Sequence, residues 1–139
     1  MTPDIEAFVR LAFAAQLPLK TWGADLCSIR SGSVVLSCPI TEPLTVAGTG
    51  IVMGGIVATL ADVAAGLSII SVLDSPRPVT TLDFSFHAIA AARGERLEAI
   101  GQVRKPGRNF AIASTEVFVL SGENRRLCAI LTATFAVAG

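Results

Sequence analysis

The sequence predicts an α+β domain in which one long helix is wrapped by a curved antiparallel sheet. Three features of the chain support this fold class. An apolar run from Gly54 to Leu73 is long enough for a central helix, two short strands precede it, and four strands joined by short turns follow it. Because the chain contains no second long helix after these strands, a single helix must cover one face of the whole sheet.

The bulk composition suits one domain, residues 1–139, that associates with copies of itself. The chain is 52% hydrophobic and only 16% charged, which is apolar for a monomer of 139 residues. We therefore expect a homodimer or a homotetramer. The formal net charge is zero, so neither nucleic acid nor an acidic membrane surface is an expected partner.

The termini and cysteines indicate a cytoplasmic protein. Residues 1–6 are acidic where a secretion leader would be positive. The three cysteines are far apart and form no Cys-x-x-Cys, so buried thiols are expected rather than a zinc site or disulfides. The run Ile51–Leu73 is long enough to span a membrane, but Asp62 lies near its centre. A charge there costs about 2.5–3.5 kcal/mol, which disfavours a membrane helix.

The first 40 residues predict a lead-in helix and a hairpin. Thr2 is a suitable N-cap and Pro3 a suitable first helical residue, and Pro18 is expected to close the helix within residues 1–20. Strands are predicted at 26–30 and 33–39 around a Ser-Gly turn, followed by a loop over residues 41–50.

The long helix is expected to end near Leu73, before the turn-forming run of residues 74–78. Large apolar residues recur at helical spacing and form one predicted packed face: Ile56, Leu60, Val63, Leu67 and Ile70. Asp62 lies roughly 120° from that face, on the side of Gly55, Thr59 and Gly66, which are all small. A ligand or a second chain is therefore expected to approach the helix beside this carboxylate.

The rest of the chain alternates as strands do. In the strand that begins at Val79, Leu82, Phe84 and Phe86 are expected to face the helix. The residues expected on the opposite face are Thr81, Asp83, Ser85 and His87. Turns near residues 93–94, 105–109 and 121–124 separate three further predicted strands: 96–104, 110–120 and 126–137.

Two features of the long helix are candidates for chemistry. A lone carboxylate in an apolar run is costly to bury, so Asp62 is a candidate general base or nucleophile. The alternative is a structural carboxylate that accepts hydrogen bonds from neighbouring backbone or across a subunit interface. Free N–H groups at Gly54 and Gly55 suit a carbonyl oxygen that gains negative charge, although paired glycines also simply shape helix entries.

The order of elements and the run from Gly50 to Asp62 resemble the hotdog-fold acyl-CoA thioesterases of the phenylacetate-degradation type, which are 4-hydroxybenzoyl-CoA thioesterase-like. That family typically shows Asn-Pro-x-Gly-x-x-His-Gly-Gly and then an acidic residue seven positions after the second glycine, and Gly55 to Asp62 keeps this spacing. Residues 80–86 resemble the family's central strand, and residues 105–108 resemble its basic turn.

The resemblance implies hydrolysis of an acyl-CoA thioester at a site between subunits. It implies that the N–H of Gly54 binds the thioester carbonyl, that Asp62 attacks it or activates water, and that Thr81 of the other subunit orients the water. Neither a metal ion nor a further cofactor is implied, because coenzyme A is part of the substrate.

Further residues are implied in substrate binding: Met53, Gly55, Ala47, Thr59, Arg108 and Lys105. The last two belong to a set of basic residues that could hold the coenzyme A phosphates or could simply be solvated: Arg93, Arg96, Arg104, Lys105 and Arg108. Met53 stands where the family usually has His, and Ala47 where it usually has Asn or Gln.

Two other functions remain open at this point. A hotdog protein that binds acyl-CoA without turnover is one alternative, motivated by Met53 and Ala47. A hotdog hydratase or dehydratase is another, but it needs a His near the acid. The sole histidine, His87, lies at the far end of its strand from Thr81 and is expected at the surface or an interface. The chain has no Gly-x-Ser-x-Gly signature of a serine hydrolase.

Overall fold

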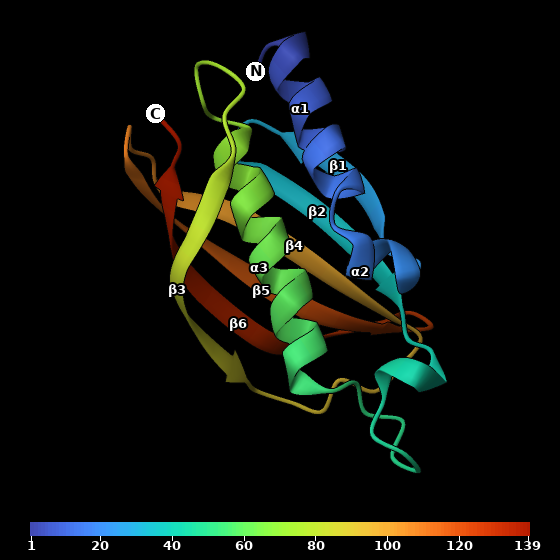
Figure 1. Cartoon of the computed structure of the whole chain (residues 1–139). Coiled ribbons are helices and arrows are strands. Elements are labelled where there is room, and N and C mark those ends of the chain that lie inside the picture. The colour runs from blue at the N-terminus through green and yellow to red at the C-terminus, as the bar shows by residue number, and fades with distance from the viewer.

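The computed structural model describes residues 1–139 and confirms the predicted fold class. Six antiparallel strands form one curved sheet, in the order β1-β2-β4-β5-β6-β3, and helix α3 lies across the concave face (Figure 1). The helical elements are α1 (Pro3–Ala14), α2 (Leu17–Thr21), the 3-10 turn η1 (Glu42–Leu44) and α3 (Gly54–Ile70). The strands are β1 (Asp25–Arg30), β2 (Ser33–Pro39), β3 (Val79–Ala88), β4 (Arg96–Lys105), β5 (Phe110–Ser121) and β6 (Asn124–Val137).

The N-terminal segment forms two helices instead of the single predicted one. Thr2 caps α1 as expected, because its hydroxyl accepts a hydrogen bond from the N–H of Ile5 at 3.2 Å. The helix ends at Ala14, however, before Pro18. Pro18 belongs to the first turn of α2, where a missing N–H costs nothing, so it helps to start a helix rather than to end one.

Helix α3 ends at Ile70, earlier than the predicted Leu73, because Ser71 fixes its C-terminus. The Ser71 hydroxyl donates to the Ser68 carbonyl at 2.6 Å and accepts the N–H of Gly32 at 2.8 Å. The end of the helix is thereby tied to the β1–β2 turn.

The packed side of α3 is only partly the predicted one. Leu60, Leu67 and Ile70 are buried as predicted, whereas Ile56 and Val63 are only half-buried. Small residues that were not predicted to pack, Ala61, Ala64 and Ala65, are fully buried as well. The small residues let the helix lie close to the sheet, where the buried Thr115 hydroxyl donates to the Ala61 carbonyl at 2.7 Å.

Gly66 is buried, although it lines the cleft beside Asp62 as expected of the small-residue side of the helix. A Cβ at Gly66 would lie 3.1 Å from the ring of Phe135 on β6. The missing side chain therefore makes room for an aromatic ring of the same chain.

The closest approach between helix and sheet occurs at Gly101 on β4 and predicts a large stability effect. A Cβ there would lie 2.2 Å from the carbonyl oxygen of Ala64, so α3 would have to move away from the sheet. We expect Gly101→Ala to lower the free energy of unfolding by about 3 kcal/mol, measured by urea denaturation. Gly55→Ala is the matched control, because a Cβ at Gly55 meets no atom within 4 Å. Equal midpoints for the two variants would contradict the close packing.

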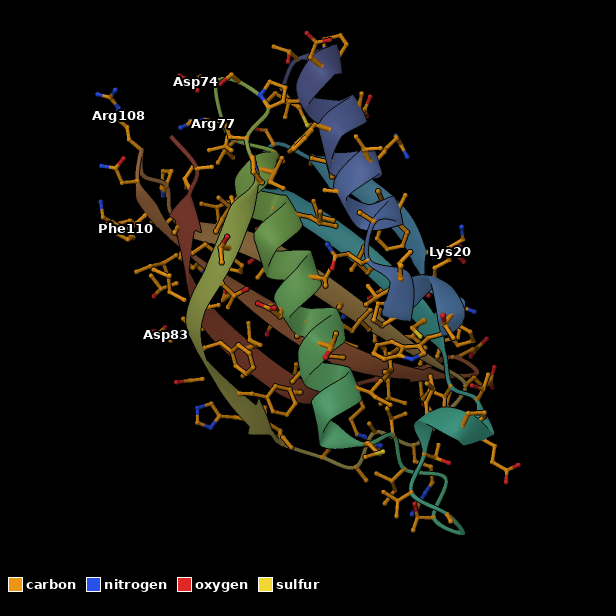
Figure 2. The ribbon with its side chains drawn as sticks, in the orientation of Figure 1. Lys20, Asp74, Arg77, Asp83, Arg108 and Phe110 are labelled. Atoms are coloured by element: carbon orange, nitrogen blue, oxygen red, sulfur yellow. The ribbon has the colours of Figure 1, made fainter.

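Strand β3 contains a bulge that the alternating pattern did not predict. Thr81 pairs with Phe135 and Asp83 pairs with Thr134, which leaves Leu82 as the extra residue. Because Phe135 is buried against the helix, Thr81 faces α3 rather than sharing a face with Asp83. Figure 2 shows Asp83 on the side of β3 away from α3.

Two expectations about the surface can also be compared with the structure. No helix is both long and apolar enough to cross a membrane. Cys38 and Cys128 are buried as expected, and burial raises the pKa of both thiols, but Cys27 is exposed. His87 is exposed, as predicted.

Candidate active site

The bulge in β3 brings Thr81 into contact with the carboxylate of α3. The Thr81 hydroxyl donates a hydrogen bond to Oδ1 of Asp62 at 2.8 Å. Both residues are half-buried and belong to the same chain. The expectation that Thr81 would reach the carboxylate from a partner subunit is therefore corrected: the pair forms within one protomer.

Burial makes Asp62 a stronger base than an ordinary aspartate. Removal from water raises the pKa of the Asp62 carboxyl, and the hydrogen bond from Thr81 opposes this rise to a smaller extent. Asp62 takes part in no salt bridge. A carboxylate with a raised pKa and one oxygen free to accept a proton has the properties of a general base.

Asp62 and Thr81 line a cleft of about 530 Å³ between α1, α3 and β3. Of the 15 residues that line it, 9 are hydrophobic. The full lining is Phe8, Leu11, Ala12, Ala15, Gln16, Asp62, Val63, Gly66, Leu67, Ile70, Pro78, Val79, Thr80, Thr81 and Phe135. The sequence indicated that α1 is amphipathic, but its position beside Asp62 depends on tertiary packing. The α1 residues of this cleft are the main part of the site that sequence reasoning missed.

The N-terminal end of α3 carries unpaired backbone donors. The N–H groups of Gly54 and Gly55 make no hydrogen bond, and a Cβ on either residue would meet open space. Gly54 borders an apolar groove of about 380 Å³ that also includes Phe86 and Ala91. Exposed N–H groups at the positive end of a helix are suited to bind a carbonyl oxygen that gains negative charge.

The other residues expected near the N-terminus of α3 contribute few polar groups. Met53 is 50% exposed and precedes the helix without a side-chain cap, and Ala47 is exposed on the preceding loop. The Thr59 hydroxyl is already used, because it donates to the Gly55 carbonyl at 2.8 Å.

Gly54 and Asp62 lie well apart along α3. They are separated by eight residues of α3, which is about 12 Å along the helix axis. A single carbonyl group that accepts the Gly54 N–H and is attacked by a water bound to Asp62 of the same chain would have to bridge most of this length.

The basic residues do not form one cluster. Lys105 and Arg108 are exposed in the β4–β5 turn, near the C-terminal end of α3. Arg93, Arg96 and Arg104 instead bond to nearby oxygens, of Thr49, Ser37 and Ser114 respectively.

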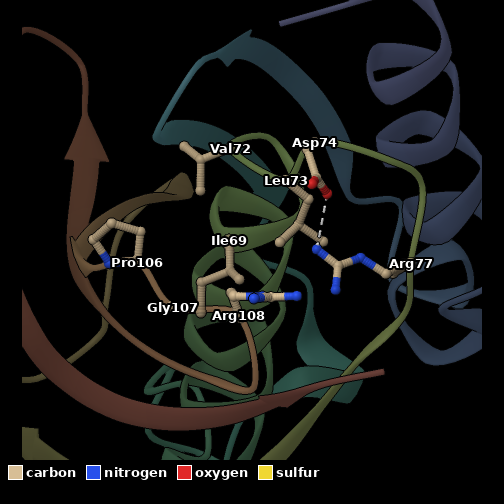
Figure 3. A pocket seen from close by; sticks show the side chains of 8 residues that line it. All are labelled: Ile69, Val72, Leu73, Asp74, Arg77, Pro106, Gly107 and Arg108. Carbon is tan, nitrogen blue, oxygen red and sulfur yellow. Dashed lines mark hydrogen bonds and ion pairs between the residues drawn. The ribbon is translucent and has the colours of Figure 1, made fainter. Parts of the chain in front are cut away.

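Arg108 borders a small cavity of about 310 Å³ together with Arg77, which sequence reasoning did not single out. Arg77 is paired with Asp74 at 3.0 Å and donates to the Ala138 carbonyl at 3.3 Å (Figure 3). The buried Nε of Arg77 has no partner. This cavity lies at the opposite end of α3 from Gly54.

Thr81→Val tests whether the hydroxyl tunes the carboxylate. Since the hydrogen bond lowers the pKa of Asp62, its removal raises that pKa further. We expect the acidic limb of the pH profile of kcat/KM for thioester hydrolysis to move to higher pH. Thr81→Ser keeps the hydroxyl and serves as the control. Superimposable profiles for the Val and Ser variants would contradict this role.

Asp62→Asn should stabilise the fold at neutral pH. The pKa of Asp62 is raised in the folded state. Ionisation of this carboxyl therefore lowers the free energy of unfolding as pH rises above the ordinary aspartate pKa. Asn removes this penalty and can still accept the Thr81 hydrogen bond. We expect a higher Tm than wild type at pH 7, with the difference vanishing in acid where both forms are neutral. A lower Tm at pH 7 would contradict the assignment.

The class of the protein follows from its sequence and its fold. A sequence model of the Thioesterase superfamily matches residues 49–125, and the chain belongs to this superfamily. The six-stranded sheet around α3 is accordingly the hotdog thioesterase fold. The structure contains no group of three or more His, Cys, Asp or Glu side chains arranged to bind a metal ion.

Solved structures extend the likeness over nearly the whole chain. A thioesterase family protein from Silicibacter pomeroyi is 31% identical, with a TM-score of 0.91 over 96% of this chain and 97% of that one. Thioesterase HI1161 from Haemophilus influenzae is 18% identical, with a TM-score of 0.84 over 100% and 93% of the two chains. PaaI from the phenylacetic acid degradation operon of E. coli is 18% identical, with a TM-score of 0.85 over 98% and 94%. A search among curated proteins found no significant match.

Proposed function

We propose that the protein hydrolyses acyl-CoA thioesters, with Asp62 as the base. The observation that carries this proposal is the Asp62–Thr81 pair, a carboxylate of raised pKa that is oriented by a hydroxyl at 2.8 Å inside an apolar cleft. Such a cleft suits an acyl group, and the carboxylate suits activation of a water molecule beside it. Membership of the Thioesterase superfamily supports the same chemistry.

In the proposed reaction, Thr81 holds Oδ1 of Asp62 and leaves Oδ2 to accept a proton from water. The resulting hydroxide attacks the thioester carbonyl carbon, and the carbonyl oxygen takes up negative charge. Collapse of the tetrahedral intermediate breaks the carbon–sulfur bond and releases the acid and the coenzyme A thiolate, which takes the proton back from Asp62. The alternative is direct attack by Asp62, which forms an anhydride. In a single turnover in H₂¹⁸O, label in the Asp62 carboxyl group would indicate the anhydride.

We propose that the negative charge is stabilised by Gly54 of a second copy of the chain. The distance along α3 supports this arrangement, because about 12 Å between Gly54 and Asp62 of one chain is long for a single carbonyl group to bridge. The free edge of β3 also supports it, since Leu82 is 53% exposed and Phe84 is 47% exposed there. A homodimer would cover these side chains, and a homotetramer remains a further expectation.

The remaining finer expectations belong to this proposal. Lys105 and Arg108 are proposed to contact the coenzyme A phosphates, since both are exposed and basic. Assignment to the phenylacetate-degradation type rests on the spacing from Gly55 to Asp62, because 18% identity to E. coli PaaI shows only the shared fold. We also propose that the protein acts in the cytoplasm.

One feature favours a second candidate function, binding of acyl-CoA without turnover. Met53 and Ala47 are exposed beside the entrance to α3, and neither offers the side-chain donor that the resemblance implies at its position.

A panel of acyl-CoAs, with release of free thiol as the measurement, separates the two functions. Hydrolysis of at least one acyl-CoA much faster by wild type than by Asp62→Ala supports the enzyme. Equal rates for both, together with tight binding of acyl-CoA, would establish the non-catalytic alternative.

A further inference from the structure

We infer that helix α1 sets the acyl specificity of this protein and restricts it to uncharged, apolar acyl groups larger than acetyl. This inference rests on the proposed thioesterase function, because it names the group that occupies the cleft beside Asp62. It concerns a part of the chain outside the family match, which begins at residue 49.

Helix α1 has two apolar faces, and only one of them is needed to anchor it. Ile5 and Val9 are spaced one turn apart and are 1% and 0% exposed, so they fasten the helix to the body of the protein. A second set of residues at helical spacing, which ends at the C-cap residue Ala15, lines the Asp62 cleft: Phe8, Leu11, Ala12 and Ala15. Leu11 is 65% exposed. An exposed leucine over an apolar cleft provides a surface for an apolar guest.

The lining of the cleft disfavours an acyl group that carries a carboxylate. Asp62 is its one ionisable lining residue, and no Lys or Arg lines it. A terminal carboxylate on the acyl group would therefore lie in an apolar cleft with no cation to pair with it. Gln16, between α1 and α2, also lines the cleft, and its side-chain amide donates to the Ala12 carbonyl at 3.2 Å.

The competing location for the acyl group is the apolar groove beside Gly54. That groove is smaller, at about 380 Å³ against about 530 Å³ for the Asp62 cleft, and α1 does not contribute to it. Substitutions in the Asp62 cleft and in the Gly54 groove therefore distinguish which of the two holds the acyl group.

The test compares matched alanine-to-leucine variants in a chain-length assay. Ala15→Leu narrows the Asp62 cleft, Ala91→Leu narrows the Gly54 groove, and Ala7→Leu adds the same atoms to an exposed position of α1 outside both. The measurement is kcat/KM for acetyl-, hexanoyl-, octanoyl-, phenylacetyl- and succinyl-CoA. We expect Ala15→Leu to lower the octanoyl-to-acetyl ratio about tenfold or more, and Ala7→Leu to leave it unchanged.

A second variant covers the case in which Ala15→Leu disturbs the fold. Leu11→Ala removes apolar contact from the same cleft, and because Leu11 is exposed, the fold should persist. It should also lower the octanoyl-to-acetyl ratio. A ratio that changes in Ala91→Leu but in neither α1 variant would overturn the inference, as would succinyl-CoA hydrolysed as fast as octanoyl-CoA.

Failure of the proposed function is recognisable separately, because wild type would then hydrolyse no member of the panel. In that event the thioether octyl-CoA, which cannot be hydrolysed, is titrated by calorimetry. Binding weakened about tenfold by Ala15→Leu but not by Ala7→Leu supports the role of α1. Equal affinity for all three proteins contradicts it.

Discussion

A Gly54→Pro variant should fold normally and lose about 10²–10³-fold in kcat for thioester hydrolysis. Proline lacks the N–H that we propose to stabilise the carbonyl oxygen. The first residue of a helix tolerates proline well, and Gly54 is the first residue of α3. Met53 has φ −58° and ψ 136°, a conformation compatible with a following proline. The substitution therefore removes one donor with little change in backbone geometry.

Gly54→Ala is the control for the added carbon atoms. It keeps the N–H, and its Cβ would meet no atom within 4 Å. We expect activity within a few-fold of wild type for the Ala variant. If the Pro variant, with an unchanged circular-dichroism spectrum and Tm, were as active as the Ala variant, the N–H of Gly54 would have no catalytic role.

Asp62→Asn should lower kcat for the best acyl-CoA by about 10³-fold, measured by release of free thiol. Asn has the shape of Asp and can accept the same hydrogen bond from Thr81, but it cannot take a proton from water. The expected gain in Tm at pH 7 for the same variant separates loss of chemistry from loss of fold.

Val63→Ala offers a neighbouring control, since Val63 also lines the cleft and is half-buried but carries no titratable group. We expect it to retain most of the turnover of a short acyl-CoA. Hydrolysis by Asp62→Asn at a rate similar to that of Val63→Ala would show that another group is the base.

The order of α1, α3 and the six strands could be predicted from local patterns because each has a short-range physical cause. Thr2 and Pro3 start α1 through their own hydrogen-bonding geometry, and the two-residue alternation marks the later strands. The burial of the small residues of α3 could not be predicted in the same way. Ala61 and Ala64 are buried because β4 approaches closely at Gly101, a long-range contact.

The candidate site shows the same division between local and long-range causes. The position of Asp62 in an apolar run made it a candidate from the sequence alone, and the family resemblance pointed to Gly54. The resemblance implied Thr81 of the other subunit, whereas Thr81 contacts Asp62 of its own chain, because the bulge at Leu82 turns Thr81 toward α3 and no local pattern marked that bulge. The cleft lining from α1 depends on the docking of α1 beside α3, which no residue of α1 specifies by itself.

The most direct test of the proposed site is to mix two inactive variants, Asp62→Asn and Gly54→Pro, after reversible dissociation of the subunits. A mixed dimer contains one site with Asp62 from the Pro variant and Gly54 from the Asn variant, and this site is intact. With random reassociation, about a quarter of the wild-type activity should return. A mixture no more active than its two parents, in a preparation shown to contain mixed dimers, would contradict a site shared between two copies of the chain.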